Sequence, residues 1–477
     1  MEYGILSIIP PIITIILAIT TGQVVVSLFL GIVFCNLIIT DWNLISSLNQ
    51  SLNGIIDVFG ESWATKTLIF VFLIGGIMTL IQVSGGVQGF VDYLTKKKRI
   101  IKSRRGTMLL AYFIGIVVFI ESSITILLAG TITRDLADKY KVSREKLAYI
   151  CDSTSAPICG LIPLNGWGAT ILGVLSAQVA AGVVDINPVT ILIKSIPYQI
   201  YSYITILTVL YFILSGNDFG PMKKAEDRAM KDGKVLADDA RPVIGEEAIH
   251  LPVKKGIKPS MWHMILPILV LVIMVPTGLY ITGNGNMTQG SGSTALFWAI
   301  FVVTIFTGIY YIGKGIMNLK EYMDYFYKGI GGMIPVSSIL IFAFAIGNSI
   351  NTLGTGRYLA NLLNGASINP AFTGVIVFIL AGIMAFATGT SFGTFAIMIP
   401  IALQTAVVLN GNIYLAVGAA ISGGIMGDHC SPISDTTIMS SMATASDHIH
   451  HVKTQIPYAL LNAGISSIIF IILGYLA

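Results

Sequence analysis

Apolar stretches long enough to cross a membrane recur along the whole chain, and they constrain the fold more than any other feature. A spanning helix needs about 20 predominantly apolar residues. Residues 4–40 are almost free of charge, and single apolar blocks occupy 64–91, 106–133, 187–215, 261–283, 294–313 and 455–477. Other apolar blocks, interrupted by Gly, Pro, Ser and Thr, lie near 156–183, 333–354, 371–406 and 413–427. We expect about 10 to 13 membrane segments, counting partial ones.

The scarcity of charge excludes a soluble protein. Only 11% of the 477 residues are charged, whereas soluble domains carry about 25%. The predicted fold class is therefore an all-α polytopic membrane protein that lies in a lipid bilayer and binds no nucleic acid. The start of the chain, MEYGILSIIPP, lacks a basic region, so we interpret it as the beginning of the first helix and not as a cleaved signal.

Basic residues cluster in three segments, which are 95–105, 134–146 and 222–258. Loops rich in Lys and Arg face the cytoplasm, so the block 106–133 has a cytoplasmic loop at each end. A single span would place its ends on opposite sides of the membrane. We therefore predict a re-entrant helical hairpin whose polar tip is Glu121-Ser122-Ser123. Such backbone is tolerated where protein or water surrounds it.

The second half of the chain repeats features of the first in the same order. The matching segments are 69–86 with 339–356, 115–125 with 382–394, and 152–157 with 428–432. Basic residues flank the first hairpin but are sparse around the second, where Arg357 stands alone. This asymmetry predicts two halves of opposite orientation, and inverted repeats with broken helices are typical of secondary transporters.

These features predict three parts. Residues 1–216 would form the first repeat with its preceding helices, 217–258 a solvated cytoplasmic linker, and 259–477 the second, inverted repeat.

The segment 427–461 contains the most informative polar motif. Asp428, Ser431, Asp435 and Thr436 lie between apolar blocks, and Pro432 is expected to break the helix there because it lacks an amide hydrogen. Freed carbonyls, carboxylates and hydroxyls are the oxygen ligands that hard cations prefer. A carboxylate at this depth is costly unless it has a partner or a water path.

A matching segment, 148–173, places Asp152, Ser153 and Thr154 before Pro157. The two predicted hairpin tips add Glu121, Ser122 and Ser123 in one half, and Thr388, Thr390 and Ser391 in the other. Four polar breaks that meet near the membrane midplane would form one site.

A buried carboxylate holds its proton more tightly than one in water, so a proton and a sodium ion can compete for it. The candidates, in order of preference, are Asp428, Asp152, Asp435 and Glu121. Structural roles remain open for each, because Asp152 and Asp428 could be helix N-caps and Glu121 could be a hydrogen-bonded acid inside the bundle. The Ser and Thr residues could be helix-packing contacts.

Histidines are concentrated near the same motif. We interpret His448, His450 and His451 as residues of the membrane surface beside Lys453.

Three segments together resemble the NhaC family of sodium/proton antiporters. They are GDHCSPISDTT (427–437), SDHIHHVKTQIPYAL (446–460) and DSTSAPICGLIPLNGWGA (152–169). The resemblance implies Na⁺/H⁺ antiport at a prokaryotic plasma membrane, without a cofactor, by a homodimer with a scaffold domain and a moving transport domain. It implies Na⁺ at Asp152, Thr154, Asp428 and Ser431. Other branches of the wider superfamily have Asn-rich tips, whereas this chain has ESS and TGTS, which favours a cation.

Sodium/proton antiport is the function that these observations favour. The main alternative is sodium- or proton-coupled exchange of a small organic acid or amino acid, as in malate/lactate-type antiporters. The basic residues inside apolar blocks are Lys66, Lys194 and Arg357, and none is beside a motif, which disfavours a bulky anion. A channel and a membrane enzyme are weaker alternatives, because paired polar breaks suit alternating access and no base-and-orienter arrangement accompanies Cys430 or Ser431.

Overall fold

The fold is known from a computed structural model, which describes residues 3–21, 23–95, 103–119, 122–242, 253–254, 256–286, 290–354, 358, 369–432 and 434–476. These residues form helices and no strand. The first half contains η1 (Gly4–Ile8), α1 (Ile9–Thr21), α2 (Val24–Ile39), α3 (Leu44–Gly60), α4 (Ser62–Val83), α5 (Gly86–Thr95), α6 (Arg104–Val117), α7 (Ser122–Lys139), α8 (Arg144–Leu161), α9 (Gly166–Ala180), α10 (Pro188–Ser195), η3 (Ile196–Tyr198), α11 (Ile200–Ser215) and α12 (Gly220–Lys231). The second half contains α13 (Trp262–Thr282), α14 (Gly292–Gly313), α15 (Leu319–Gly332), α16 (Ile334–Leu353), η5 (Pro370–Phe372), α18 (Thr373–Thr388), α19 (Ser391–Val408), α20 (Ile413–Cys430), α21 (Asp435–Thr444) and α22 (His448–Leu476).

In the described part of the chain, seven helices are long and apolar enough to cross a membrane, or up to nine if each bent pair is one span. The bent pairs are α8 with α9, at 44°, and α15 with α16, at 46°. Shorter apolar helices at Gly4–Leu17 and Val25–Ile39 add partial segments, which the predicted total also counted. The predicted all-helical polytopic membrane fold is confirmed.

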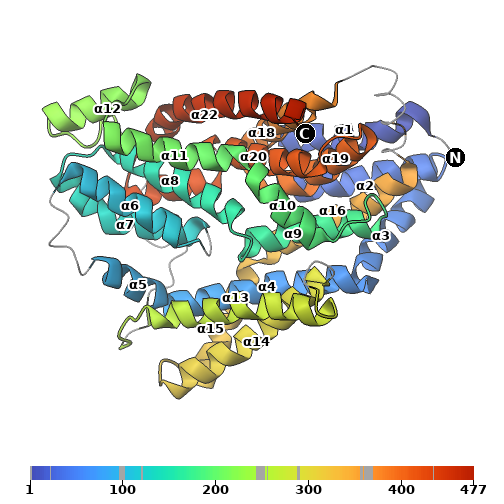
Figure 1. Cartoon of the computed structure of the whole chain (residues 1–477), viewed down its shortest axis with the longest axis horizontal. Helices are drawn as coiled ribbons and strands as arrows, with labels where there is room; N and C mark the ends of the chain where they lie inside the picture. The colour runs from blue at the N-terminus through green and yellow to red at the C-terminus, as the bar shows by residue number, and fades with distance from the viewer. Residues whose placement is uncertain are drawn as a thin grey trace.

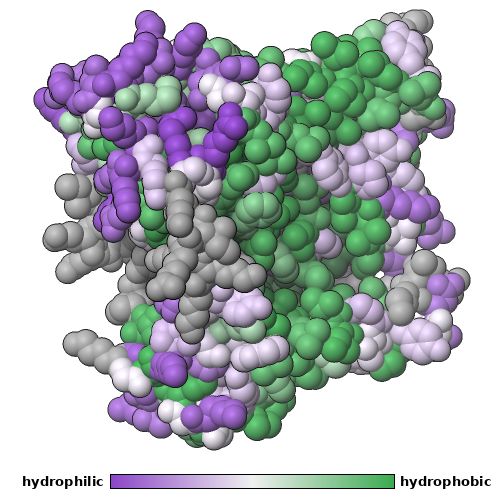
Figure 2. All heavy atoms as spheres, turned by 60° about the vertical axis from the view of Figure 1, so that its left-hand side comes forward, coloured by the Kyte–Doolittle hydropathy of each residue, from purple (hydrophilic) through white to green (hydrophobic). Residues whose placement is uncertain are grey.

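The long helices form two packed groups (Figure 1). Helices α4, α13, α14 and α15 pack together in the lower part of the view, and α8, α11, α20 and α22 pack together in the upper part. Helices α9 and α16 contact α4 on one side and α19 on the other. Figure 2 shows hydrophobic side chains over a broad area of one face, as a surface in contact with lipid requires.

Two helical hairpins each precede a helix that carries a predicted site aspartate. Helices α6 and α7 pack on each other and on α8, as a helical hairpin would. Its re-entry into the membrane stays a prediction, and Glu121 lies outside the described residues. Helices α18 and α19 likewise pack on α20. Gly389 ends α18 with a φ of 64°, a left-handed conformation that glycine adopts without steric cost. The opposite orientation of the two halves stays a prediction.

The two predicted helix breaks differ in their outcome. Helix α20 ends at Cys430 and α21 begins at Asp435, so the predicted break around Pro432 is confirmed. The predicted break at Pro157 is wrong, because α8 continues through this proline to Leu161. Neighbouring helices can satisfy the carbonyl that a buried proline frees, and the bend instead lies between α8 and α9.

Glycines allow α18 and α20 to approach at backbone distance. A methyl group on Gly427 would overlap the carbonyl oxygen of Gly382, and one on Gly423 would overlap the carbonyl oxygen of Phe378. Gly423 and Gly427 are four residues apart, the spacing of small residues at tightly packed membrane helices. This pair therefore needs glycine for its packing.

We expect Gly427→Ala to lower the melting temperature of the purified protein, because overpacking costs about 1–3 kcal/mol. The measurement is thermal unfolding in detergent, with Gly464→Ala in α22 as the matched control, since a methyl group there meets nothing within 4 Å. Equal melting temperatures for the two variants would contradict close α18–α20 packing.

Residues 217–242 form a structured part of the predicted linker. Helix α12 packs on α8 and α22, and Met222 and Glu226 are buried. The backbone amide of Ser143 donates to Glu226 at 2.9 Å. Most side chains of 217–242 are exposed or half-buried, but a few charged residues find partners on the first turn of α8. The role of this segment as a cytoplasmic linker stays a prediction.

Two ion pairs hold the start of α8 to this segment. Lys146, fully buried, places its Nζ 2.5 Å from Oδ1 of Asp218. Nη2 of Arg228 donates to both carboxylate oxygens of Glu145, each at 2.9 Å. The hydroxyl of Tyr458 in α22 also donates to Asp218 at 2.7 Å, so the segment joins α8 to α22.

We expect Asp218→Asn to destabilise the protein strongly, because removing one partner of a buried ion pair costs about 3–5 kcal/mol. The double variant Lys146→Met/Asp218→Asn leaves no uncompensated charge and should recover most of the lost melting temperature. Thermal unfolding of both variants tests this, and a double variant no more stable than Asp218→Asn would contradict it.

Candidate functional site

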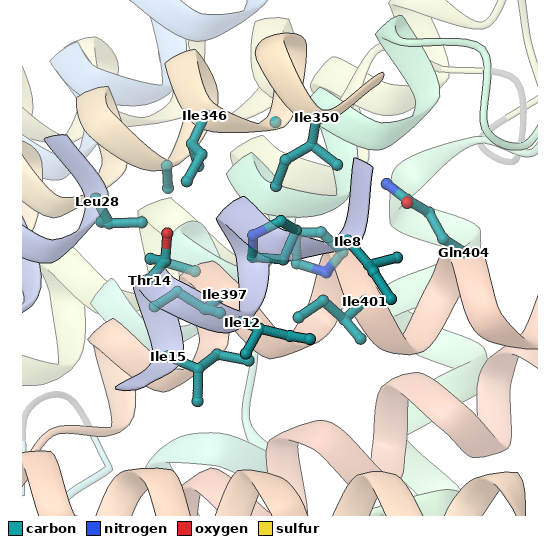
Figure 3. A pocket seen from close by; sticks show the side chains of 15 residues that line it. Ile8, Ile12, Thr14, Ile15, Leu28, Ile346, Ile350, Ile397, Ile401 and Gln404 are labelled. Atoms are coloured by element: carbon teal, nitrogen blue, oxygen red, sulfur yellow. The ribbon is translucent and has the colours of Figure 1, made fainter. Parts of the chain in front are cut away.

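An apolar cavity of about 190 Å³ lies between α1, α2, α16 and α19 (Figure 3). Isoleucines such as Ile12, Ile346 and Ile397 line it, and Thr14 and Gln404 are the polar side chains on its wall. Such a lining suits hydrocarbon and offers few ligands to an ion. The polar site lies elsewhere, around the two predicted aspartates.

Asp428 is held by hydroxyls from two interruptions of the helices. It is 2% exposed and lies three residues before the break that follows α20. Its Oδ2 accepts hydrogen bonds from the Oγ of Ser391 at 2.5 Å and from the amide of Ser391 at 3.1 Å. Its Oδ1 accepts one from the Oγ of Ser434 at 2.7 Å. One carboxylate therefore joins the hairpin tip to the unwound stretch.

The start of α19 explains the position of this carboxylate. Thr390 caps the helix, and its Oγ1 accepts from the amide of Gly393 at 3.4 Å. Ser391 is the first helical residue, so the positive end of the helix dipole faces Asp428. Helix N-termini commonly bind anions in this way.

Asp152 lies in the middle of α8 and is fully buried. Its Oδ2 accepts a hydrogen bond from Nε2 of Gln455 at 2.9 Å and lies 3.3 Å from Nε2 of His451. Its Oδ1 has no hydrogen-bond partner among the described residues. Both partners come from α22, so α8 and α22 build this half of the site.

Gln455 connects the two aspartates. Its Nε2 also donates to the carbonyl oxygen of His429, the residue that follows Asp428. Carboxylates predicted from the two halves of the chain therefore belong to one buried polar cluster.

The other residues predicted around the second hairpin lie close to this cluster. Ser431 is buried and donates its hydroxyl hydrogen to the carbonyl of Phe386 at 2.6 Å. Thr436 is buried, with its Oγ1 3.1 Å from the Oγ of Ser434. Thr388 ends α18 and donates to the carbonyl of Met384 at 2.9 Å.

Residues predicted in the first half are less closely assembled. Ser122 begins α7 and is buried, whereas the side chain of Ser123 lies outside the described part. Ser153 is buried and its Oγ has no partner within the described residues. Thr154 donates to the carbonyl of Ile150 at 2.7 Å and packs against Gly115 of α6, on a different face of α8 from Asp152.

The structure excludes helix capping for the preferred aspartates. Asp152 and Asp428 both lie inside helices, and Ser434 is the residue that caps α21. Asp435 is exposed at the first position of α21, with its Oδ1 2.9 Å from the amide of Thr436. Asp435 does not contact the carboxylate of Asp428 among the described hydrogen bonds.

Sequence reasoning missed three residues of the cluster: Ser434, His451 and Gln455. The predicted surface position of His451 is wrong, because this side chain is fully buried against Asp152. A signal for it exists in α22, where four polar residues recur at spacings of four, seven and four positions, which places them along one face of the helix: His451, Gln455, Asn462 and Ser466.

The described cluster carries no basic side chain beyond its histidines. No described Lys or Arg forms a hydrogen bond or ion pair with Asp152 or Asp428, and Lys66 and Lys194 are engaged with Thr294 and the ring of Tyr414. The described residues also contain no group of three or more His, Cys, Asp or Glu side chains that could hold a metal ion.

Two solved transporters share this fold. The YdaH transporter of Alcanivorax borkumensis superposes with a TM-score of 0.58 at 14% identity, over 90% of this chain and 89% of that one. MtrF of Neisseria gonorrhoeae, described as representing a class of antimetabolite efflux pumps, gives a TM-score of 0.54 at 12% identity, over 91% and 85%. At these identities the likeness concerns the fold alone.

Curated relatives extend the comparison. An uncharacterized protein of Haemophilus influenzae is 34% identical over 98% of this chain and 91% of its own length. An uncharacterized Na⁺/H⁺ antiporter of the same organism is 26% identical over 37% of each chain. The malate-2H⁺/Na⁺-lactate antiporter of Bacillus subtilis is 27% identical over 33% of this chain and 34% of that protein. Two of these three relatives are antiporters by name.

The family model described as the Na⁺/H⁺ antiporter family matches residues 158–475. This match covers the second hairpin, α20 and all of α22 except its last residue, which together hold Asp428, His451 and Gln455. Because it extends over more than half of the chain, the protein belongs to the Na⁺/H⁺ antiporter family.

Proposed function

We propose that this protein is a sodium/proton antiporter that exchanges Na⁺ for H⁺ by alternating access. The observation that supports the proposal is the burial of Asp152 and Asp428 in one polar cluster that no described Lys or Arg neutralises. Two carboxylates enclosed by apolar helices need a positive charge nearby. A small cation or a proton supplies that charge.

Asp428 and Asp152 are the proposed primary ligands of the transported Na⁺. The hydroxyls of Ser391 and Ser434 already reach Asp428, and a hydroxyl that donates its hydrogen keeps lone pairs for a cation. Ser431 and Thr154 remain proposed ligands, because their hydroxyls also donate their hydrogen to a carbonyl and keep lone pairs. The carbonyl of Ser153 is a further candidate oxygen, because Pro157 has no amide hydrogen to donate to it.

Exchange follows if Na⁺ and H⁺ occupy the cluster in turn. A carboxylate in a low-dielectric site favours its neutral form, so release of Na⁺ favours uptake of a proton. The ligands come from the tip before α19, the break after α20 and the middle of α8. Loss of the cation therefore changes the hydrogen bonds of three separate elements, which couples occupancy to conformation.

The second candidate function is sodium- or proton-coupled exchange of a small organic acid or amino acid. The similarity to a malate-2H⁺/Na⁺-lactate antiporter favours it. A carboxylic acid needs a cationic partner or a free helix N-terminus, and the N-terminus of α19 is occupied by Asp428. The site geometry therefore supports a cation more than an organic anion.

The proposal includes a multi-pass location in a prokaryotic plasma membrane and a homodimer. Both come from the resemblance to the NhaC family, and crosslinking in native membranes would test the dimer.

We expect Asp428→Asn to abolish sodium-driven proton movement in proteoliposomes that contain a pH-sensitive dye. An inward Na⁺ gradient should make the lumen of wild-type vesicles alkaline, whereas the variant should match empty vesicles, because an amide binds neither H⁺ nor Na⁺ as a carboxylate does. Asp152→Asn should also reduce the signal.

Asp135→Asn is the matched control, because Asp135 in α7 is 92% exposed, and this variant should transport like the wild type. A fully active Asp428→Asn protein would contradict the proposed site. A wild-type protein that responds to malate, lactate or an amino acid, and not to Na⁺ alone, would replace the proposed function with the second candidate.

A further inference from the structure

Buried polar atoms without a protein partner are concentrated in one region. Among the described residues, nine with such an atom lie on α8, on α22 or at the start of α11. They are Tyr149, Asp152, Ser153, Gln199, Ser202, His451, Gln455, Asn462 and Ser466, each at most 1% exposed. We call this set the polar lane. Other described residues of this kind, such as Thr307 and Ser337, are scattered.

The members of the polar lane lie at a common helix interface. Helices α8, α11 and α22 contact one another in pairs. The ring of Tyr149 lies 4.9 Å from that of Tyr458 in α22, and Asn462 donates to Oγ1 of Thr205 in α11 at 3.2 Å. Oε1 of Gln199 lies beside Gly160 of α8.

Helical spacing aligns these residues along the interface. Tyr149 and Ser153 are four residues apart, as are Asn462 and Ser466, so each pair shares a helix face. Gln455 and Asn462 are seven residues apart and also share a face. The polar atoms are therefore spread along the helix axes and are not gathered in one compact cluster.

Unpaired buried polar groups of this number are unfavourable. Each unsatisfied donor or acceptor loses the hydrogen bonds that water would give it, and the surrounding lipid offers none. Buried water that makes two to four hydrogen bonds is the usual partner for such groups. An ion would instead need several oxygens at one point, and the spread of the lane along the helices disfavours this.

We propose that a file of buried water occupies the polar lane and reaches Asp152. One end of the lane lies beside Lys146, because Nζ of Lys146 lies 5.4 Å from the ring of Tyr149 and pairs with Asp218. Asp218 lines an open cavity of about 370 Å³ together with Arg104, Lys223 and Glu226. The file gives protons a route between this cavity and Asp152, and that role rests on the proposed antiport.

Radiolytic footprinting of the full-length protein tests for the water directly. Hydroxyl radicals that an X-ray pulse generates from bound water modify the side chains beside it. Tyr149 should be modified several-fold faster than Tyr311, although both are at most 1% exposed. Tyr311 is the matched control, because its hydroxyl donates to the carbonyl of His263 at 2.5 Å and lies 3.2 Å from Ser84.

Two variants connect the labelling to the lane. Asn462→Leu, which replaces two polar atoms by an apolar group of similar size, should lower the modification of Tyr149 several-fold. Ser337→Ala in α16 should leave it unchanged. Equal protection of Tyr149 and Tyr311 in the wild type, or unchanged labelling in a folded Asn462→Leu protein, would overturn the proposal.

A transport measurement tests the role of the water. Asn462→Leu should slow Na⁺/H⁺ exchange several-fold, while equilibrium binding of radioactive ²²Na⁺ to the purified protein stays unchanged. Wild-type exchange rates in this variant would overturn the proton route. If the wild type shows no sodium-driven proton movement, the proposed antiport fails, and the footprint still decides whether the lane holds water.

Discussion

The structure depends on the way in which two carboxylates are stabilised away from water. Asp428 receives three hydrogen bonds from Ser391 and Ser434, so both of its oxygens are satisfied. Asp152 is satisfied at one oxygen, by Gln455 and His451, and not at the other. The two halves of the cluster are therefore unequal, and the less satisfied carboxylate is the one with capacity for a further partner.

The different surroundings of the two aspartates explain why one is fully hydrogen-bonded and the other is not. Helix α20 packs the face that carries Gly423 and Gly427 directly against the backbone of α18, and it places Asp428 at the start of α19. Helix α8 carries Asp152 between polar faces of α11 and α22, and its first turn is fixed by ion pairs to residues 217–242. The amide of Gln455 joins the two surroundings, because it donates both to Asp152 and to the backbone carbonyl of His429, the residue that follows Asp428.

The sequence predicted the features that local chemistry determines. Long apolar runs give the helices, Pro432 gives the break after α20, and Asp152 and Asp428 were singled out because a carboxylate is rare in such runs. The partners of these carboxylates were not predictable, since Gln455 and His451 reach Asp152 from about 300 residues away and only packing brings them together. The predicted helix break at Pro157 fails for a similar reason, because contacts with neighbouring helices keep α8 continuous through this proline. The burial of Glu226 is also not predictable from sequence, because the surrounding segment is highly charged and reads as exposed.

The glycine contact between α18 and α20 limits how the protein can rearrange. Backbones in direct contact have no flexible side chains between them that could take up a sliding motion. Any displacement of Asp428 must therefore move α18 and α20 together as one rigid unit. Short non-helical joints at Gly389 and around Pro432 connect this pair of helices to α19 and α21, so a bend at these joints would let α18 and α20 move together relative to both neighbours.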